Sequence, residues 1–333
     1  MSARNILIGN GINVNYGGKD YTNGKIIERL KDNLSDVARY ESVFKGTVSA
    51  EELLGLVKGL NDIFNKMLKE SIFSLRRTET EDEMRSLIDI SRRYKGKSFD
   101  LLEVGMEDYF FVMKWFNNGY SDGAELSKCA FDGLKWLFLD AIYNEGKIEE
   151  LYKEMTPFAK ELSSFNKIFT VNYDTNLDKL TSNTVYHLHG SFLKLDDTYR
   201  TETIIGLLAS QKDNPPQIVT GKEHMYCNAI MGYSGEYKYK QMDNYRFINS
   251  KLTDKTKAAN EYPIEEFRSI EGELHIIGMS PSNDSHITNM INNNPNISSV
   301  IFYCIDTETF TEAKRVIKKP LQMRNVLKYW KSL

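Results

Sequence analysis

Short runs of apolar residues recur along the chain, and each predicts a buried β-strand. The runs are rich in Ile, Val or aromatic residues and end near Gly, Asn or Asp; they cover residues 5–8, 167–171, 185–188, 273–277 and 299–304. Continuous apolar runs, unlike alternating ones, are typical of parallel strands that are buried on both faces. The pattern therefore predicts an α/β fold with a doubly wound, mostly parallel sheet and helices on both of its faces.

The spacing of the first two strands indicates a large insertion between them. A crossover between parallel strands needs only about a dozen residues, yet the second strand begins at residue 167. Apolar residues recur at helical spacing from Leu53 to Met67 and from Leu126 to Ala141. We expect one domain over residues 1–333, with a core at 1–24 and 163–310, a helical insertion at 25–162, a polar insertion at 194–265 and C-terminal helices at 311–333.

Composition narrows the class of protein. The 43 basic and 46 acidic residues are interspersed and leave a net charge of −3, so no overall basic character argues for a nucleic-acid partner. No apolar run is long enough to span a bilayer, and the first residues do not resemble a secretory signal. Three scattered cysteines without a CxxC pair exclude an internal disulfide framework and a four-cysteine zinc site. We expect a reduced, cytoplasmic protein with no membrane and no direct nucleic-acid partner.

The first strand ends in a glycine turn, Gly9-Asn10-Gly11, which leads through Ile12 to Asn13. A strand that ends in G-x-G and feeds a helix lets backbone N–H groups approach a phosphate. The full G-x-G-x-x-G fingerprint needs a third glycine, where Val14 stands. A tight turn that binds no ligand is the alternative interpretation.

Polar residues follow the second strand, where open α/β sheets bind their ligands. Asn172 could orient a water molecule or a ribose hydroxyl, and Asp174 could hold a hydroxyl or stabilise a developing positive charge. The alternative is an Asn-x-Asp turn that only caps the next helix.

Two histidines, His187 and His189, lie on the same face at the end of the third strand. They could share a metal ion, but the motif offers no third ligand, so we expect no metal. His189 precedes a glycine at the strand end and is better placed to enter a cleft as a general base. His187 lies further inside the strand and is expected to be structural.

The fourth strand ends in a further glycine turn, Gly278-Met279-Ser280, which leads to Asp284. Ser280 could donate a hydrogen bond to a phosphate. Asp284 could hold a ribose, or it could simply cap the following helix.

In their order along the chain these four motifs resemble the sirtuin family. Sirtuins carry a G-A-G-x-S turn, a Q-N-x-D turn, a catalytic H-G histidine and a late G-T-S turn, all of which face NAD. The resemblance covers roughly residues 4–16, 165–192 and 270–306. It implies a Rossmann-like core with catalytic Asn172, Asp174 and His189, and with NAD-binding residues Gly9, Asn10, Gly11, Asn13, Gly278, Ser280 and Asp284.

The departures from the sirtuin pattern point to one branch of that family. Val171 stands in place of Gln, and the four zinc cysteines of deacylating sirtuins are missing from the sequence. The chain looks closer to the sirtuin-like NAD hydrolases of bacterial antiphage defence, and it also resembles the abortive-infection H family, which shares a GNG turn and an H-x-H-G segment. The resemblance implies an enzyme that hydrolyses NAD to nicotinamide and ADP-ribose without a metal, as the effector of an abortive-infection system.

Three other functions stay open at this point. They are a defence effector with a different nucleotide substrate, a non-catalytic sensor of NAD or ADP-ribose, and a protein deacylase. The resemblance also implies control by assembly, because an unregulated NAD hydrolase would drain its own cell. The expected partners are further copies of the chain in a homo-oligomer, or a separately encoded HerA-type ATPase.

Overall fold

The computed structural model describes residues 3–35, 137–193, 263–281 and 284–333, with single positions and short stretches between 51 and 97 and at 227 and 229. The chain divides into two compact units. The first comprises residues 1–22, 143–194 and 242–333 and contains the sheet; the second comprises residues 23–142 and 195–241.

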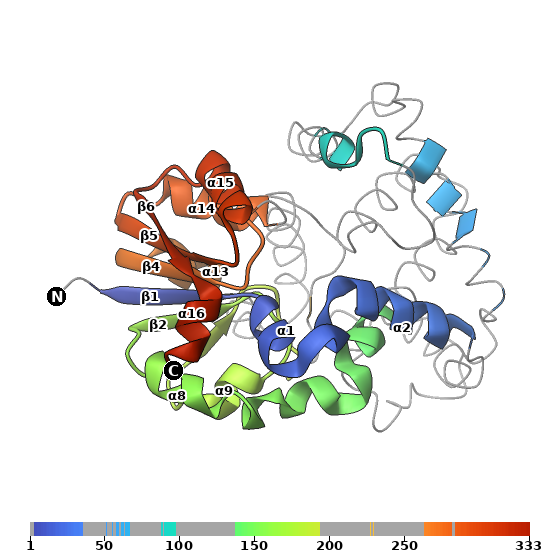
Figure 1. The fold of residues 1–333 in the computed structure, drawn as a ribbon, viewed down its shortest axis with the longest axis horizontal. Helices are drawn as coiled ribbons and strands as arrows, with labels where there is room; N and C mark the ends of the chain where they lie inside the picture. Colours follow the sequence, from blue (N-terminus) through green and yellow to red (C-terminus); the bar gives the residue numbers. More distant parts are fainter. Residues whose placement is uncertain are drawn as a thin grey trace, which may run out of the picture. The chain divides into compact units, whose positions relative to one another are not determined.

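The first unit is built on a six-stranded parallel sheet. Its strand order is β3-β2-β1-β4-β5-β6, which is the order of a Rossmann fold, and every neighbouring pair is parallel. In Figure 1, β6, β5, β4, β1 and β2 follow one another from top to bottom. The strands are β1 (Arg4–Ile8), β2 (Lys167–Thr170), β3 (Val185–His187), β4 (Gly272–Ile277), β5 (Ile297–Cys304) and β6 (Leu321–Asn325).

Helices fill the connections between these strands. Right-handed crossovers put the helices before β2 and β3 on one face of the sheet and those before β5 and β6 on the other. Trp330 of α16 closes the first face, because its ring packs edge-on against Tyr16 of α1 and Phe158 of α8. Among the described residues of this unit, the helices are α1 (Gly11–Gly17), η1 (Gly18–Tyr21), η4 (Asn144–Lys153), α8 (Thr156–Leu162), α9 (Asn176–Leu180), α13 (Ile264–Arg268), α14 (Ser285–Asn293), α15 (Thr307–Val316) and α16 (Val326–Lys331).

The predicted α/β fold and all five predicted strands are confirmed. The strands are completely buried where the pattern was most apolar, at Ile6, Leu7, Phe169, Leu274 and Ile276. Each predicted run lies within two residues of the strand that forms. The continuous apolar pattern thus identified the strands that helices cover on both sides.

The prediction of helices alone at 311–333 is wrong. Helix α15 begins earlier, at Thr307, and residues 321–325 form the sixth strand before α16 completes the chain. This strand pairs only with β5 and lies at the edge of the sheet. Its residues alternate between half-buried and exposed, so it lacks the continuous apolar run on which the other strands were recognised.

The second unit contributes the helix α2 (Asn23–Ser35), and residues 137–142 of this unit are also helical. Within this unit the guanidinium of Arg29 donates a hydrogen bond to the carbonyl oxygen of Ala141. Residues 143–162, which the sequence grouped with the helical insertion, belong to the same unit as the sheet. Most of the two predicted insertions lies outside the described residues. No helix in the described ranges is long and apolar enough to cross a membrane.

Candidate functional site

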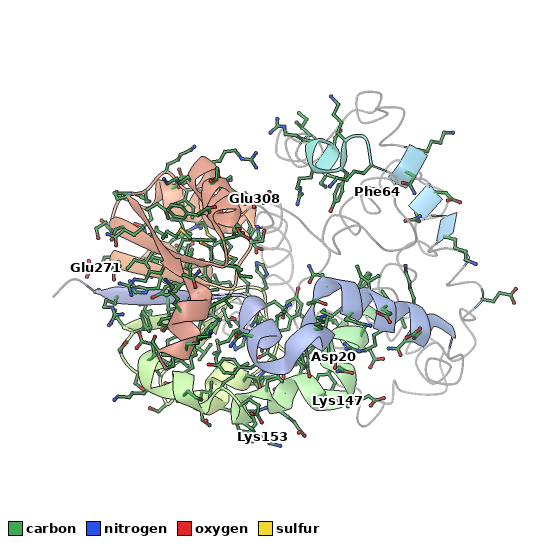
Figure 2. The ribbon with its side chains drawn as sticks, viewed as in Figure 1. Asp20, Phe64, Lys147, Lys153, Glu271 and Glu308 are labelled. Carbon is green, nitrogen blue, oxygen red and sulfur yellow. The ribbon has the colours of Figure 1, made fainter. Side chains whose placement is uncertain are left out.

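All of the predicted site residues follow the carboxyl ends of β1 to β4. The opposite, amino edge of the sheet is marked by Glu271, which precedes β4 and is labelled at the left in Figure 2. Between β1 and β4 the strand order reverses direction, since β2 follows β1 on one side and β5 follows β4 on the other. In open α/β sheets ligands bind in the crevice beside such a switch point, outside the carboxyl ends of the strands.

The two glycine turns pack backbone against backbone at this switch point. A Cβ atom on Gly9 would lie 2.6 Å from the carbonyl oxygen of Gly278, and one on Gly11 would lie 2.5 Å from the Cα of Gly278. Gly278 itself has a φ of +70°, in the left-handed region that favours glycine. The turns after β1 and β4 therefore fit together only without side chains at these three positions.

The same packing uses two of the amides that the glycine motif offered to a phosphate. The N–H of Gly9 donates to the carbonyl oxygen of Ile277 at 2.8 Å, and the N–H of Gly11 donates to that of Gly278 at 2.9 Å. Close approach of the two turns thus accounts for the glycines. This is the role that the alternative interpretation, a tight turn without a ligand, gave to them.

The predicted residues Asn13 and Asp174 meet across the sheet edge. The Nδ2 atom of Asn13, in α1, donates to Oδ2 of Asp174 at 2.7 Å and to Oδ1 of Asn10 at 3.3 Å. The other carboxylate oxygen of Asp174 accepts hydrogen bonds from the backbone N–H and the side chain of Asn176. Asp174 therefore both shapes the turn before α9 and binds the first helix.

Burial governs the acidity of this carboxyl group. Asp174 is 2% exposed, and its desolvation raises the pKa above the ordinary value for aspartate. The hydrogen bonds from Asn13 and Asn176 lower the pKa but do not cancel this effect, and the negative charge of Glu149 adds to it. Ionisation of Asp174 therefore makes the folded state less stable.

Asn172 is held by its backbone and leaves its amide group available. Its N–H donates to the hydroxyl of Thr170, and its carbonyl oxygen faces Nδ1 of His187 at 3.1 Å. Within the described part of the chain, the Nδ2 atom of Asn172 is buried without a hydrogen-bond partner, and so is Oδ1 of Asn13. Buried polar groups are nearly always hydrogen-bonded, so these two atoms mark a place where a polar ligand would supply the missing partners.

His187 and His189 turn to different partners, so the pair does not assemble as a shared metal site. The Nε2 atom of His187 lies 2.9 Å from Oδ2 of Asp178. Burial alone would lower the pKa of His187, but the hydrogen bond and the charge of Asp178 outweigh it and the net pKa is raised. These contacts are of the kind expected for the structural role predicted for His187.

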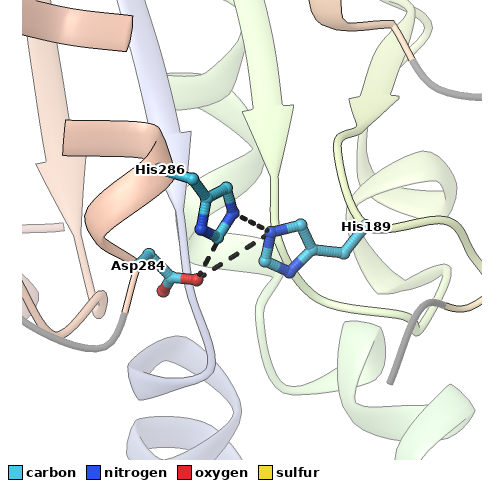
Figure 3. Close-up of side chains that lie close together, drawn as sticks. All are labelled: His189, Asp284 and His286. Atoms are coloured by element: carbon cyan, nitrogen blue, oxygen red, sulfur yellow. Dashed lines mark hydrogen bonds and ion pairs between the residues drawn. The ribbon is translucent and has the colours of Figure 1, made fainter. Parts of the chain in front are cut away.

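His189 faces two residues that follow β4. Its Nε2 atom lies 2.9 Å from Nε2 of His286 and 3.8 Å from Oδ1 of Asp284, and His286 Nε2 lies 4.0 Å from the same oxygen (Figure 3). All three side chains are buried, with His286 completely inaccessible. Their ligand atoms lie within 4.8 Å of one another, so the three could hold a metal ion.

The side chain of Asp284 is not used as a helix cap. Asp284 is the N-cap residue of α14, yet its carboxylate makes no capping hydrogen bond. The carboxylate points instead toward the two histidines (Figure 3). The capping interpretation of Asp284 is therefore wrong for its side chain.

The sequence analysis missed His286. The available signal was an Asp-x-His spacing at the start of a helix that follows a strand, but only the tertiary structure shows that His286 faces His189. Ser280 follows the β4 turn as predicted and is half-buried, and the described contacts give it no partner in the site. A comparison with protein-family models, curated proteins and solved structures finds no match.

Proposed function

We propose that the chain hydrolyses NAD to nicotinamide and ADP-ribose at the carboxyl edge of its sheet. The observation that carries the proposal is the pair of buried amide atoms, Asn172 Nδ2 and Asn13 Oδ1, beside the switch point of a Rossmann-ordered sheet. A buried polar atom without a partner costs about 1–3 kcal/mol. Ribose hydroxyls and the nicotinamide carboxamide offer donors and acceptors of the kind that these atoms lack.

The order of the motifs supports NAD over other polar ligands. The glycine turn, the Asn-x-Asp turn, the His-Gly segment and the late glycine turn follow one another as in sirtuins. In this proposal Gly9, Gly11 and Gly278 shape the turns over which the dinucleotide lies. Asn10, Ser280 and other polar groups would then make the contacts to it.

The reaction breaks the bond between C1′ of the ribose and the ring nitrogen of nicotinamide. The ring leaves as a neutral molecule that takes the bonding electron pair, so no acid is needed to protonate it, and a positive charge develops on the sugar as in glycoside hydrolysis. Water then adds to C1′ and loses a proton. Asn172 would position the water or the ribose, and His189 would accept the proton or hold a hydroxyl.

Asp174 fits the role of a positioning residue. Both of its oxygens already accept hydrogen bonds from Asn13 and Asn176, so it fixes the two turns around the sugar. When ionised, its carboxylate would stabilise the positive charge that develops on the ribose.

Incubation of the purified protein with NAD, followed by chromatography, tests the proposal. We expect nicotinamide and ADP-ribose in equal amounts, in the presence of a chelator as well as in its absence. Asn293→Ala, an exposed asparagine of α14, serves as the control for Asn172→Ala. Binding of NAD in calorimetry without release of nicotinamide would indicate a sensor, and no binding at all would favour an effector with a different nucleotide substrate.

Control by assembly is the part of the proposal that concerns partners. Light scattering would show whether the isolated chain, of 38.4 kDa, forms an oligomer. A monomer that hydrolyses NAD rapidly without any partner would contradict this part and leave the activity itself standing.

A further inference from the structure

We propose that His189, His286 and Asp284 form a binding site for a zinc ion. The two imidazoles and the carboxylate come from different parts of the chain, His189 from the turn after β3 and the other two from the start of α14. They are the one group of three potential metal ligands found in the described ranges of the chain. Figure 3 shows their ligand atoms turned toward a common point.

The separations of the three ligand atoms fit one ion. The triangle formed by the two Nε2 atoms and Oδ1 of Asp284 has sides of 2.9, 3.8 and 4.0 Å. A point equidistant from its corners lies about 2.1 Å from each, which matches the usual length of zinc bonds to histidine and to carboxylate. The site therefore needs little movement to accept the ion.

The same distances favour a tetrahedral ion over an octahedral one. Ligand atoms of a tetrahedral zinc lie about 3.4 Å apart, whereas neighbouring ligands of an octahedral ion of similar size lie about 3.0 Å apart. The two separations that involve Asp284, 3.8 and 4.0 Å, are closer to the tetrahedral value than to the octahedral one, whereas the two Nε2 atoms, now 2.9 Å apart, would move apart by about 0.5 Å when the ion binds. Two imidazoles and one carboxylate are also a ligand set that zinc prefers to the harder magnesium and calcium ions.

The position of Asp284 is the second observation that points to a ligand. An aspartate at an N-cap normally accepts a hydrogen bond from the first turn of its helix, which stabilises the helix by about 1 kcal/mol. The carboxylate of Asp284 gives up that bond and lies buried near two imidazole nitrogens. Without a metal, one proton between the two Nε2 atoms explains their 2.9 Å contact; with a metal, that proton leaves and both nitrogens bind the ion.

Three protein ligands leave the fourth position of a tetrahedral zinc open for water or another small ligand. Zinc at this site would occupy the nitrogen of His189 that faces the other two residues, and would fix that ring. If His189 is the base of NAD hydrolysis, zinc inhibits the enzyme. This consequence rests on the proposed function, whereas zinc binding does not.

Equilibrium titration of the chelator-treated, full-length protein with zinc tests the site. We expect one zinc ion per chain, and we expect His286→Gln and Asp284→Asn each to weaken binding by at least about 100-fold, the upper end of what loss of an outer-shell partner costs. His187→Gln is the matched control and should retain the affinity of the unchanged chain. His187 is a buried histidine two residues from His189 that pairs with Asp178 instead.

Cobalt(II) gives a second measurement that needs no substitution. A four-coordinate cobalt ion with nitrogen and oxygen ligands absorbs visible light far more strongly than a six-coordinate one, and zinc should displace it. Circular dichroism of the metal-free variants separates loss of the site from loss of the fold.

The outcomes keep the two proposals apart. Zinc binding without any NAD hydrolysis would support the site and contradict the proposed function. NAD hydrolysis that zinc inhibits in the unchanged chain, and in His187→Gln to the same extent, would support both. Failure of the unchanged chain to bind zinc, or unaltered binding by folded His286→Gln and Asp284→Asn, would overturn the site whether or not NAD is hydrolysed.

Discussion

Two buried histidines, His275 within β4 and His189 in the turn after β3, lie in different kinds of environment. His275, in the middle of β4, uses both ring nitrogens: Nε2 lies 2.7 Å from Glu273 and Nδ1 lies 3.0 Å from the hydroxyl of Tyr303. Phe165 packs edge-on against its ring. His189, at the carboxyl edge, faces a second imidazole, that of His286, at 2.9 Å and the carboxylate of Asp284 at 3.8 Å.

The comparison distinguishes buried polar groups that stabilise the fold from buried polar groups that are available to bind a ligand. Around His275 each ring nitrogen has a partner that the fold itself supplies, and Arg4 adds an ion pair with Glu273. At the carboxyl edge of the sheet, two buried atoms, Nδ2 of Asn172 and Oδ1 of Asn13, have no hydrogen-bond partner among the described residues. A buried polar atom without a partner costs stability, so these two atoms beside the switch point are candidates for contacts to a ligand.

The largest effect that the comparison predicts is on turnover. His189→Ala should lower the kcat of NAD hydrolysis by about 10²- to 10⁴-fold, the usual contribution of a general base, and Asn172→Ala should be similarly inactive. Both variants should fold, because neither removes a group on which the sheet depends. Steady-state kinetics together with thermal unfolding would check this. Near-normal turnover in His189→Ala would mean that His189, like His275, has no part in the reaction.

Replacement of Asp174 by asparagine sharpens the distinction between function and stability. Asp174→Asn should reduce turnover by about 100-fold, a loss typical of one electrostatic contact in a transition state. Its free energy of unfolding at neutral pH should stay equal or rise, because burial raises the pKa of Asp174 and makes the ionised form costly. Rotation of the Asn13 amide would let its Oδ1 accept from the new side chain.

The sign of this effect follows from the raised pKa. Above the folded-state pKa the carboxylate is ionised in both states, and the folded state carries the cost of desolvation. As the pH falls through that pKa the folded chain takes up a proton before the unfolded chain does, so stability from this group increases. Asp174→Asn should lack that increase, which denaturant unfolding at a series of pH values would detect. A variant that is markedly less stable than the unchanged chain at neutral pH would contradict this account.

The close packing of the glycine turns predicts a third effect, which is on the stability of the fold. Gly278→Ala should destabilise the fold by about 1–3 kcal/mol, because a side chain at this positive φ is strained and would press on the backbone of Gly11. Gly24→Ala is the control, since Gly24 lies in α2 with open space around its Cβ position. Alanine is the better helix former, so the control should be neutral or slightly more stable. Equal effects of the two substitutions would contradict the close packing of the turns.

The sequence predicted the parts of this site that depend on local pattern. Apolar runs identified five strands, and the predicted site residues follow the carboxyl ends of the first four of them, with Asn13 in the first helix. Parallel pairing of β1 with β2 then brings Asn13 to Asp174. The sequence could predict that Asn13 and Asp174 lie near one another. It could not predict the hydrogen bond between them, because that bond depends on the direction in which α1 leaves β1.

The parts that the sequence did not predict depend on tertiary contacts or on weak patterns. His286 joins the site because the first turn of α14 lies beside the turn after β3, a tertiary contact that no spacing rule specifies. Strand β6 was missed because an edge strand that is half-exposed has no continuous apolar run. The amides of Gly9 and Gly11 were expected to stay available, but the turn after β4 supplies acceptors for them.

The smallest predicted effect concerns His275 and the pH dependence of stability. Desolvation lowers the pKa of His275 below its ordinary value, although Glu273 acts in the opposite direction. Below about pH 6.5 the unfolded chain therefore binds a proton at His275 that the folded chain does not bind. Stability falls as the pH falls, by at most about 1.4 kcal/mol per pH unit.

In His275→Gln this contribution is absent, so its free energy of unfolding should decline less steeply toward acid pH, even though the variant is less stable overall. Identical slopes would mean that the partners of His275 accommodate its charge, and the contrast with His189 would then lie in geometry alone.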